Sequence, residues 1–146
     1  MKATILTSLF AVLLSVMSLS AQNDKDVLTN SISNGTTVEK EHIEMNSETG
    51  EPYKRNFYIY DNNGKMLSKT VDSWNSKTGW VSVAKSEFGY NESGNVDYIV
   101  YTKWNESKSR WEKNSQYIAY VYDESGKYLS MEKKVVKNTD ILLTQR

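Results

Sequence analysis

The chain has no cysteine, one proline and one histidine among its 146 residues. Without cysteine it can form no disulfide, and no lipid can be attached through a cysteine behind a leader peptide. His42 would have to serve in any catalytic arrangement of histidine with serine or cysteine, and nothing near it in the sequence suggests one. Only Pro52 could interrupt a strand by its ring. The fold must therefore be held by its core and by sheet hydrogen bonds alone.

The chain also has no excess of either charge, because its formal net charge is zero. A nucleic-acid-binding domain usually carries a basic patch or stripe. We therefore expect no nucleic-acid partner.

Long apolar runs are absent except at the N-terminus. Lys2 precedes an apolar stretch over residues 5–17, and small residues follow up to Ala21. This order is typical of a secretory signal peptide, and the stretch is short for a membrane span. We expect cleavage after Ala21, no membrane span in the mature chain, and export to the periplasm, the cell surface or the medium.

A repeat is the main feature that is present. The segments "YIYDNNGK", "FGYNESGN" and "YVYDESGK" place Gly64, Gly94 and Gly126 at intervals of 30 and 32 residues. Trp74 and Trp104 repeat at the same 30-residue interval. The expected organisation is a signal peptide (1–21), a polar lead-in (22–30) and a single β-repeat domain (31–146) with units of about 31–59, 60–89, 90–121 and 122–146.

The segments between these motifs are rich in Val, Ile, Thr, Tyr and Trp and are bounded by Asn, Asp, Gly and Ser, which is typical of strands. The short connections predict antiparallel neighbours. We expect an all-β, up-and-down meander forming an open, twisted, largely single-layer sheet; a curled barrel is the alternative. The eight expected strands are 36–45, 51–60, 65–74, 80–90, 95–104, 111–122, 127–136 and 141–146.

The repeated motif reads as a turn, because an Asp or Asn side chain can accept backbone N–H groups and the glycine can adopt the left-handed conformation. The expected turn residues are Asp61, Gly64, Asn91, Gly94, Asp123 and Gly126. The "WNSKTGW" stretch reads as the opposite hairpin, with Trp74 and Trp80 paired across the ladder.

The even step from Trp80 to Tyr90 would place both rings on one face of the sheet. The step from Trp111 to Tyr122 is odd and would place the rings on opposite faces, so we predict a β-bulge between Lys113 and Tyr120 that restores a shared face.

The outermost strands need protection from unwanted pairing. Charged residues from Glu39 to Glu44 would protect the first expected strand. The last, at 141–146, is apolar and would be either covered or paired with a partner.

No metal or cofactor site is expected. The turns "DNNGK" and "DESGK" lack the alternating ligands and the final glutamate of an EF-hand, so we interpret them as turns. Carboxylates are plentiful, but no pair stands out.

The aromatic residues are the one functional lead, since exposed rings can stack on sugars or on peptide side chains. The alternative is that they only join neighbouring strands. The candidate binding residues are Tyr58, Tyr60, Trp74, Trp80, Tyr90, Trp104, Trp111, Tyr120 and Tyr122.

At "YIYDNNGK" and "YVYDESGK" the chain resembles the tyrosine–aspartate (Rhs-type) repeats of secreted bacterial proteins. The Trp-Asn hairpin and the cysteine-free form resemble more narrowly a family of small exported Bacteroidetes proteins classed as a domain of unknown function. The resemblance covers about residues 31–140 and implies export and a β-rich fold, with no known activity. The outer repeats depart from it by lacking tryptophan.

Three functions remain open. The first is a non-catalytic exported protein that binds a glycan or a surface protein through its aromatic residues. The second is a structural or assembly module that oligomerises through its sheet edges. The third, an enzyme, would be a hydrolase that relies on carboxylates alone.

Overall fold

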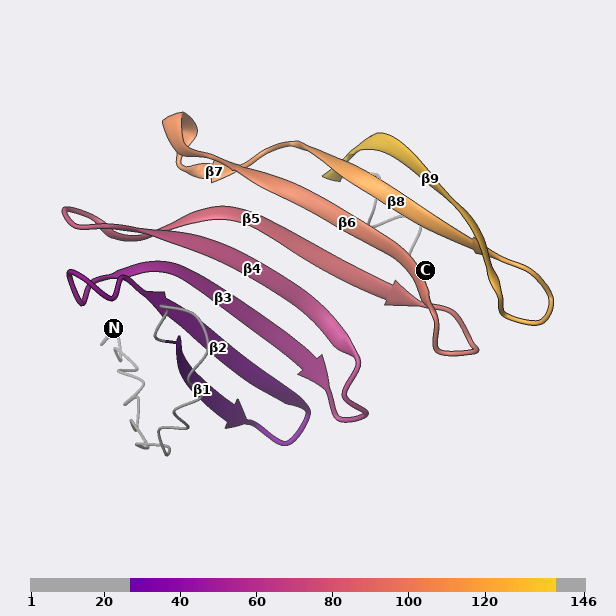
Figure 1. Cartoon of the computed structure of the whole chain (residues 1–146). Coiled ribbons are helices and arrows are strands. Elements are labelled where there is room, and N and C mark those ends of the chain that lie inside the picture. The colour runs from indigo at the N-terminus through magenta and orange to yellow at the C-terminus, as the bar shows by residue number, and fades with distance from the viewer. Residues whose placement is uncertain (1–26, 139–146) are drawn as a thin grey trace, which may run out of the picture.

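The computed structural model describes residues 27–138, which form one open sheet of antiparallel strands (Figure 1). The strands follow one another across the sheet in chain order, and β7 continues the line of β8 beside β6. The strands are β1 (Val27–Ser33), β2 (Thr37–Met45), β3 (Pro52–Asp61), β4 (Met66–Asn75), β5 (Gly79–Tyr90), β6 (Val96–Asn105), β7 (Arg110–Trp111), β8 (Asn114–Tyr122) and β9 (Tyr128–Lys137), with one short 3₁₀ helix, η1 (Glu106–Lys108).

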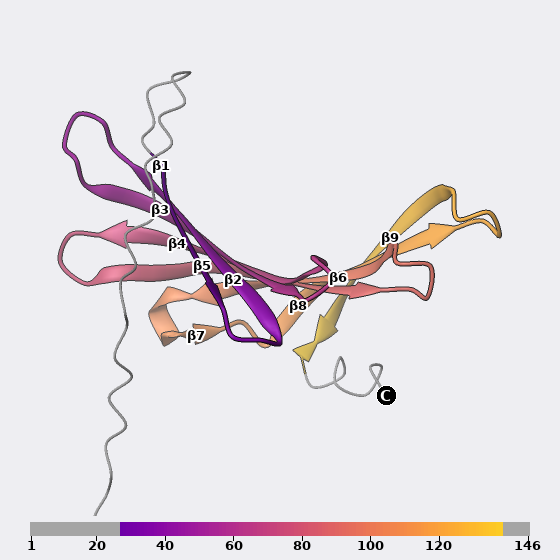
Figure 2. The ribbon, with the colours of Figure 1, turned by 90° about the horizontal axis from the view of Figure 1, so that it is seen from below.

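The sheet is a single twisted layer (Figure 2). Within the described residues, the buried hydrophobic side chains are Ala84 on β5 and Val100 on β6, and the buried polar residues are Asn56, Asp72, Thr102 and Ser115. The interior is therefore a thin zone along the middle of the sheet. The prediction of an open, largely single-layer meander is confirmed, and the sheet does not close into the alternative barrel.

Three details differ from the prediction. Residues 27–33, assigned largely to a polar lead-in, form strand β1, so the charged strand β2 lies inside the sheet instead of at its edge. The expected strand 111–122 is interrupted at Glu112 and Lys113, which separate β7 from β8. The expected strand 141–146 lies outside the described residues.

The repeated motif forms the turn that its residues predict. The Asp61 side chain accepts hydrogen bonds from the backbone N–H groups of Asn63 and Lys65 at 2.9 and 2.8 Å. Gly64 closes the turn with a φ of +81°. The Asn91 and Asp123 side chains each accept the backbone N–H four residues on, at 2.9 Å. These turns lie together at one end of the sheet.

The hairpins at the opposite end begin with an asparagine. Asn46, Asn75 and Asn105 each accept the backbone N–H three residues on, at 2.9 to 3.2 Å. The residue four positions after each asparagine has a positive φ: Gly50, Gly79 and Ser109. Ser109 is the only non-glycine with a positive φ in the described part of the chain.

Five of the strand pairs contain a register shift at which one residue of one strand has no partner on the other. Such bulges bend a strand and increase its twist. The skipped residues are Tyr53, Leu67, Val83, Asp97 and Leu129. Four of these are large and exposed hydrophobic residues, because a skipped residue has no direct partner to cover it.

Ser109 gives the first prediction. A side chain in the left-handed region costs about 1–2 kcal/mol, and glycine avoids most of that strain. We expect Ser109→Gly to raise the free energy of unfolding by about 1 kcal/mol, measured by urea denaturation. Gly79→Ser is the reverse substitution at the equivalent position of the hairpin between β4 and β5. It should lower the free energy of unfolding by a similar amount. Equal stability of wild type and Ser109→Gly would contradict the assignment of backbone strain to Ser109.

Asp123 gives the second prediction. Hydrogen bonds from the Ser125 side chain and from the Lys127 backbone lower the pKa of the Asp123 carboxyl below its ordinary value of 3.8. A lowered folded-state pKa stabilises the fold above pH 3.8, and this contribution is lost as the pH falls through the folded value.

Asp123→Asn keeps the acceptor, as Asn91 does, without titrating. Its stability relative to wild type should therefore rise when unfolding is measured at pH 2 to 3, roughly, instead of pH 6. Glu124→Gln removes the same charge from the same turn and is the control. A difference between wild type and Asp123→Asn that does not change with pH would contradict the prediction.

Candidate functional site

The nine predicted aromatic residues lie on opposite faces of the sheet. Directly opposed residues share a face, and alternate residues of a strand lie on opposite faces. By this pairing, the tryptophan face carries Trp74, Trp80, Trp104 and Trp111. The tyrosine face carries Tyr58, Tyr60, Tyr90, Tyr120 and Tyr122.

Bulges explain why the prediction of a shared face is wrong. Trp80 and Tyr90 are an even step apart, but the pairing skips Val83 between them and so inverts the alternation. The expected bulge between Lys113 and Tyr120 instead begins at Glu112, and it inserts two residues relative to β6. Two extra residues leave the alternation unchanged, so Trp111 and Tyr122 also lie on opposite faces.

The tryptophans pair across the ladder, as predicted. Trp74 with Trp80, and Trp104 with Trp111, meet edge to face with ring centroids 5.1 Å apart. The Arg55 guanidinium lies 4.9 Å from the Trp80 ring centroid. The Lys85 ammonium lies 5.6 Å from that of Trp111. One ring of each pair therefore has a cation over its face.

A groove of about 250 Å³ lies beside the tryptophan pairs. Trp74 and Trp104 line it, one from each tryptophan hairpin, and Trp80 and Trp111 do not. The remaining lining residues are Ser73, Asn75, Val81, Ser82, Val83 and Glu106. We call this hollow the tryptophan groove.

An ion cluster beside the groove was not anticipated from the sequence. Arg55 on β3 lies 2.8 Å from the buried carboxylate of Asp72 on β4, and 3.4 Å from Glu41 on β2. Ser82 donates to the other oxygen of Asp72 at 3.0 Å. The cluster fixes the guanidinium above Trp80. Only the strand register brings these residues together, so no local sequence motif could have predicted the ion cluster.

The tyrosine face combines rings with lysines. Tyr58 and Tyr60 stack with centroids 6.2 Å apart, and His42 meets Tyr58 edge to face at 5.2 Å. The ammonium groups of Lys40 and Lys69 lie 5.1 and 5.5 Å from the centroids of Tyr60 and Tyr58. Burial raises the pKa of the Tyr58 hydroxyl above its ordinary value.

Two motif tyrosines connect successive turns. Tyr90 donates its hydroxyl to the Met66 carbonyl at 2.8 Å, and Tyr122 donates to the Val96 carbonyl at 2.7 Å. Met66 and Val96 each lie two positions after a turn glycine. Burial also raises the pKa of Tyr90. These hydroxyls are engaged by the sheet itself, so Tyr90 and Tyr122 serve as structural links.

Sequence reasoning missed a third aromatic pair on the tryptophan face, nearer the end of β6 that carries the repeated turn motif. Tyr98 and Tyr117 stack with centroids 5.3 Å apart, from neighbouring strands β6 and β8. Burial raises the pKa of Tyr117. Near the end of the tyrosine face, Tyr128 packs against Tyr120 and Tyr122 at 6.2 and 6.3 Å.

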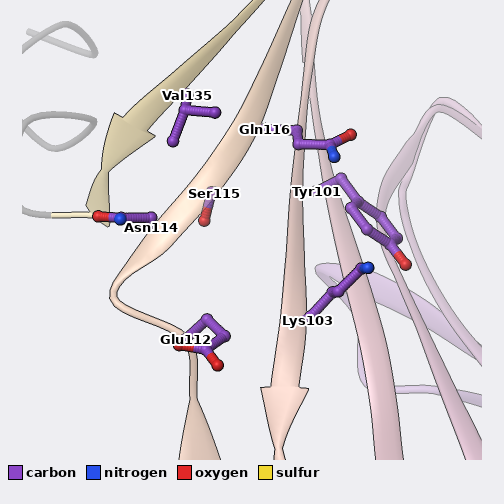
Figure 3. Close-up of a pocket in the computed structure, with 7 residues that line it drawn as sticks. All are labelled: Tyr101, Lys103, Glu112, Asn114, Ser115, Gln116 and Val135. Atoms are coloured by element: carbon purple, nitrogen blue, oxygen red, sulfur yellow. The ribbon is translucent and has the colours of Figure 1, made fainter.

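A second hollow, of about 210 Å³, opens where β6, β8 and β9 meet (Figure 3). Tyr101 and Lys103 line it from β6, and Gln116 from β8, with Val135 from β9. The other lining residues are Glu112, Asn114 and Ser115. Each of the two hollows thus holds a single carboxylate.

Between residues 27 and 138, no group of three or more His, Asp or Glu side chains is placed to hold a metal ion. The same part of the chain contains no helix long and apolar enough to span a membrane.

The fold and its two aromatic faces define an open, single-sheet β-repeat protein. The chain belongs to a family of unknown function, DUF3836, whose model matches residues 1–122. This confirms that the chain is a member of a domain family of unknown function; the wider likeness to tyrosine–aspartate repeats stays a prediction. No curated protein matches the chain.

Several solved structures are similar. A protein of unknown function from Bacteroides fragilis NCTC 9343 has 19% sequence identity and a TM-score of 0.50, covering 77% of this chain and 90% of that one. A DUF3836 protein from Parabacteroides distasonis ATCC 8503 has 15% identity and a TM-score of 0.46, covering 82% and 97%. One from Bacteroides vulgatus ATCC 8482 has 18% identity and a TM-score of 0.42, covering 74% and 97%. The first supports the fold.

Tyr90 gives the third prediction. Tyr90→Phe removes the bond to the Met66 carbonyl and leaves the ring in place, so it should lower the free energy of unfolding by about 1 kcal/mol. Tyr120→Phe is the control, because Tyr120 lies on the same face and its hydroxyl makes no hydrogen bond within residues 27–138. Chemical denaturation measures both. A loss for Tyr90→Phe no larger than that for Tyr120→Phe would contradict the linking role.

Proposed function

We propose that this protein is an exported, non-catalytic binding protein that takes a neutral glycan in the tryptophan groove. The observation that carries the proposal is that successive hairpins supply Trp74 and Trp104 to one hollow, beside polar side chains. Aromatic rings offer flat apolar faces to sugar rings, and a few placed polar groups set orientation.

The chemistry of the lining supports a neutral ligand. Asn75 and Ser82 can donate or accept hydrogen bonds, and Glu106 can accept them from sugar hydroxyls. No lysine or arginine is among the lining residues. A negatively charged ligand would therefore meet a carboxylate without a cation to offset it.

The same lining supports binding in preference to hydrolysis. Glycosidases commonly use two carboxylates flanking the bond that they cleave. Glu106 is the one carboxylate that lines this groove.

An assembly role is the second candidate, favoured by strand β1. All seven residues of β1 are exposed, none is charged, and the strand lies at the end of the described sheet. Such an edge lacks the usual charged or proline protection against pairing with another strand.

Trp104 and Trp111 provide the fourth prediction, because they form one pair in which only Trp104 lines the groove. Trp104→Leu and Trp111→Leu should lower stability to a similar extent. Only Trp104→Leu should weaken glycan binding, by about tenfold, which corresponds to about 1.4 kcal/mol. The measurement is tryptophan fluorescence of the chain from Gln22, titrated with a panel of neutral oligosaccharides and checked by calorimetry.

Equal losses of affinity in the two variants would show that binding depends on the intact pair and not on the groove. If no neutral oligosaccharide changes the emission or the heat of binding of the wild type, the proposed function is wrong, and the exposed edge of β1 becomes the leading candidate.

A further inference from the structure

The two faces of the sheet differ in charge. Among paired strand residues, the tyrosine face carries seven cations and one carboxylate, Glu44. The cations are Lys40, Lys54, Lys69, Lys103, Arg110, Lys133 and Lys137. Lys65 adds an eighth from a turn, 5.1 Å from the ring centroid of Tyr90. Glu44 is paired with Lys54 at 3.2 Å.

The tryptophan face has the opposite balance. Its paired residues include six carboxylates and three cations, and Arg55 is already held by Asp72 and Glu41. The carboxylates are Glu39, Glu41, Asp61, Asp72, Glu87 and Glu132, and the cations are Arg55, Lys85 and Lys134. The zero net charge of the chain therefore conceals a basic face and an acidic face.

Two of the basic groups, Lys40 and Lys69, lie on one row that crosses the tyrosine face, and three more lie two residues along a strand from it: Lys103, Lys133 and Lys137. Directly opposed residues on successive strands form this central row: Ser31, Lys40, Tyr58, Lys69, Ser86, Tyr101, Gln116 and Val135. Lys40 and Lys69 lie two strands apart, which is ~10 Å across the sheet. Cations, rings and hydrogen-bonding side chains thus alternate along one line.

The second hollow lies on this row. Tyr101, Gln116 and Val135 belong both to the row and to the lining of the hollow, and Lys103 stands beside Tyr101 (Figure 3). A linear ligand that follows the row from Lys40 would therefore reach a recess with an aromatic ring, an amide and a cation. The one carboxylate that lines this recess, Glu112, accepts a hydrogen bond from the Asn105 side chain at 2.6 Å.

We propose that the central row of the tyrosine face binds an acidic polysaccharide. Its carboxylate or sulfate groups would meet the lysines, which are spaced about as far apart as the ends of a disaccharide. One of its sugar rings would stack on Tyr101, and its hydroxyls would bond to Ser86 and Gln116. This site is separate from the tryptophan groove and does not depend on the function proposed for it.

The shape of the sheet favours a linear polyanion over an anionic bilayer. The sheet twists strongly between its first and last strands (Figure 2). A planar bilayer can touch only part of a twisted surface, whereas a chain one sugar wide can follow the row. Rings and amides between the cations also suit sugar units better than a uniform layer of headgroups.

The experiment compares two pairs of lysines that face opposite sides. Lys40→Gln/Lys69→Gln removes two cations from over Tyr60 and Tyr58 on the central row. Lys85→Gln/Lys134→Gln removes two cations from over Trp111 and Tyr117 on the tryptophan face. Both variants change the net charge equally and lose two ring contacts, and the second also loses the ion pair of Lys85 with Glu87 at 3.1 Å. The probe is polygalacturonate, with neutral dextran, duplex DNA and phosphatidylglycerol vesicles for comparison.

Wild type should bind polygalacturonate, and Lys40→Gln/Lys69→Gln should weaken this binding by about three- to tenfold, as expected for two exposed ion pairs. Lys85→Gln/Lys134→Gln should change it by less than about twofold. Tyr101→Leu should also weaken binding, since ring stacking distinguishes a sugar chain from a simple polyanion.

Several outcomes would overturn the proposal. These are the absence of polygalacturonate binding, equal weakening by both lysine pairs, or tighter binding to DNA, to vesicles or to dextran than to polygalacturonate. Circular dichroism of each variant establishes that the sheet is intact. Failure here leaves the tryptophan groove untouched, because its test uses neutral sugars and different residues.

Discussion

Cross-strand pairing of side chains is the interaction on which this structure depends. A single-layer sheet has no second layer to pack against, and only Ala84 and Val100 are buried as hydrophobic residues in the described part of the chain. Contacts between neighbours within each face must supply what a core would, at roughly 0.2–1 kcal/mol per pair. The paired tryptophans, the stacked Tyr98 and Tyr117, and the lysines over tyrosine rings are these contacts. The high aromatic content is therefore explained first by the cross-strand contacts that a single-layer sheet needs.

The bulges decide what each face presents to solvent. One skipped residue reverses the alternation of every residue beyond it, as at Val83, and so places the tryptophans and the motif tyrosines on different sides. Had the alternation been unbroken, the rings of β5 would have formed one surface. Instead, the sheet presents one face with an acidic balance and a tryptophan groove, and another with lysines and tyrosines. A protein built in this way has two chemically different surfaces separated by the thickness of one strand.

The sequence predicts local features of the fold well because their causes are local. Asp61 and Gly64 specify their turn within five residues, and Trp74 and Trp80 pair because a short hairpin brings them together. Strand β1 was missed because "VLTNSIS" has no aromatic residue or turn motif and gains its structure from pairing with β2. The prediction that Trp80 and Tyr90 share a face is wrong because no residue near Val83 indicates a bulge. The charge difference between the faces requires the whole register, so it could not be seen in composition.

The order of the strands has a consequence for how such a chain reaches its folded form. Each strand pairs with the strand before it in the chain, except that β8 pairs with β6 past the two-residue β7, so no contact must wait for a distant segment. Loops closed by nearby residues cost little entropy, and repeat architectures can grow unit by unit. A chain delivered from its N-terminal end, whether from a ribosome or through a membrane channel, can add one hairpin at a time to an edge that already exists. The unfinished molecule is at every stage a shorter version of the finished one.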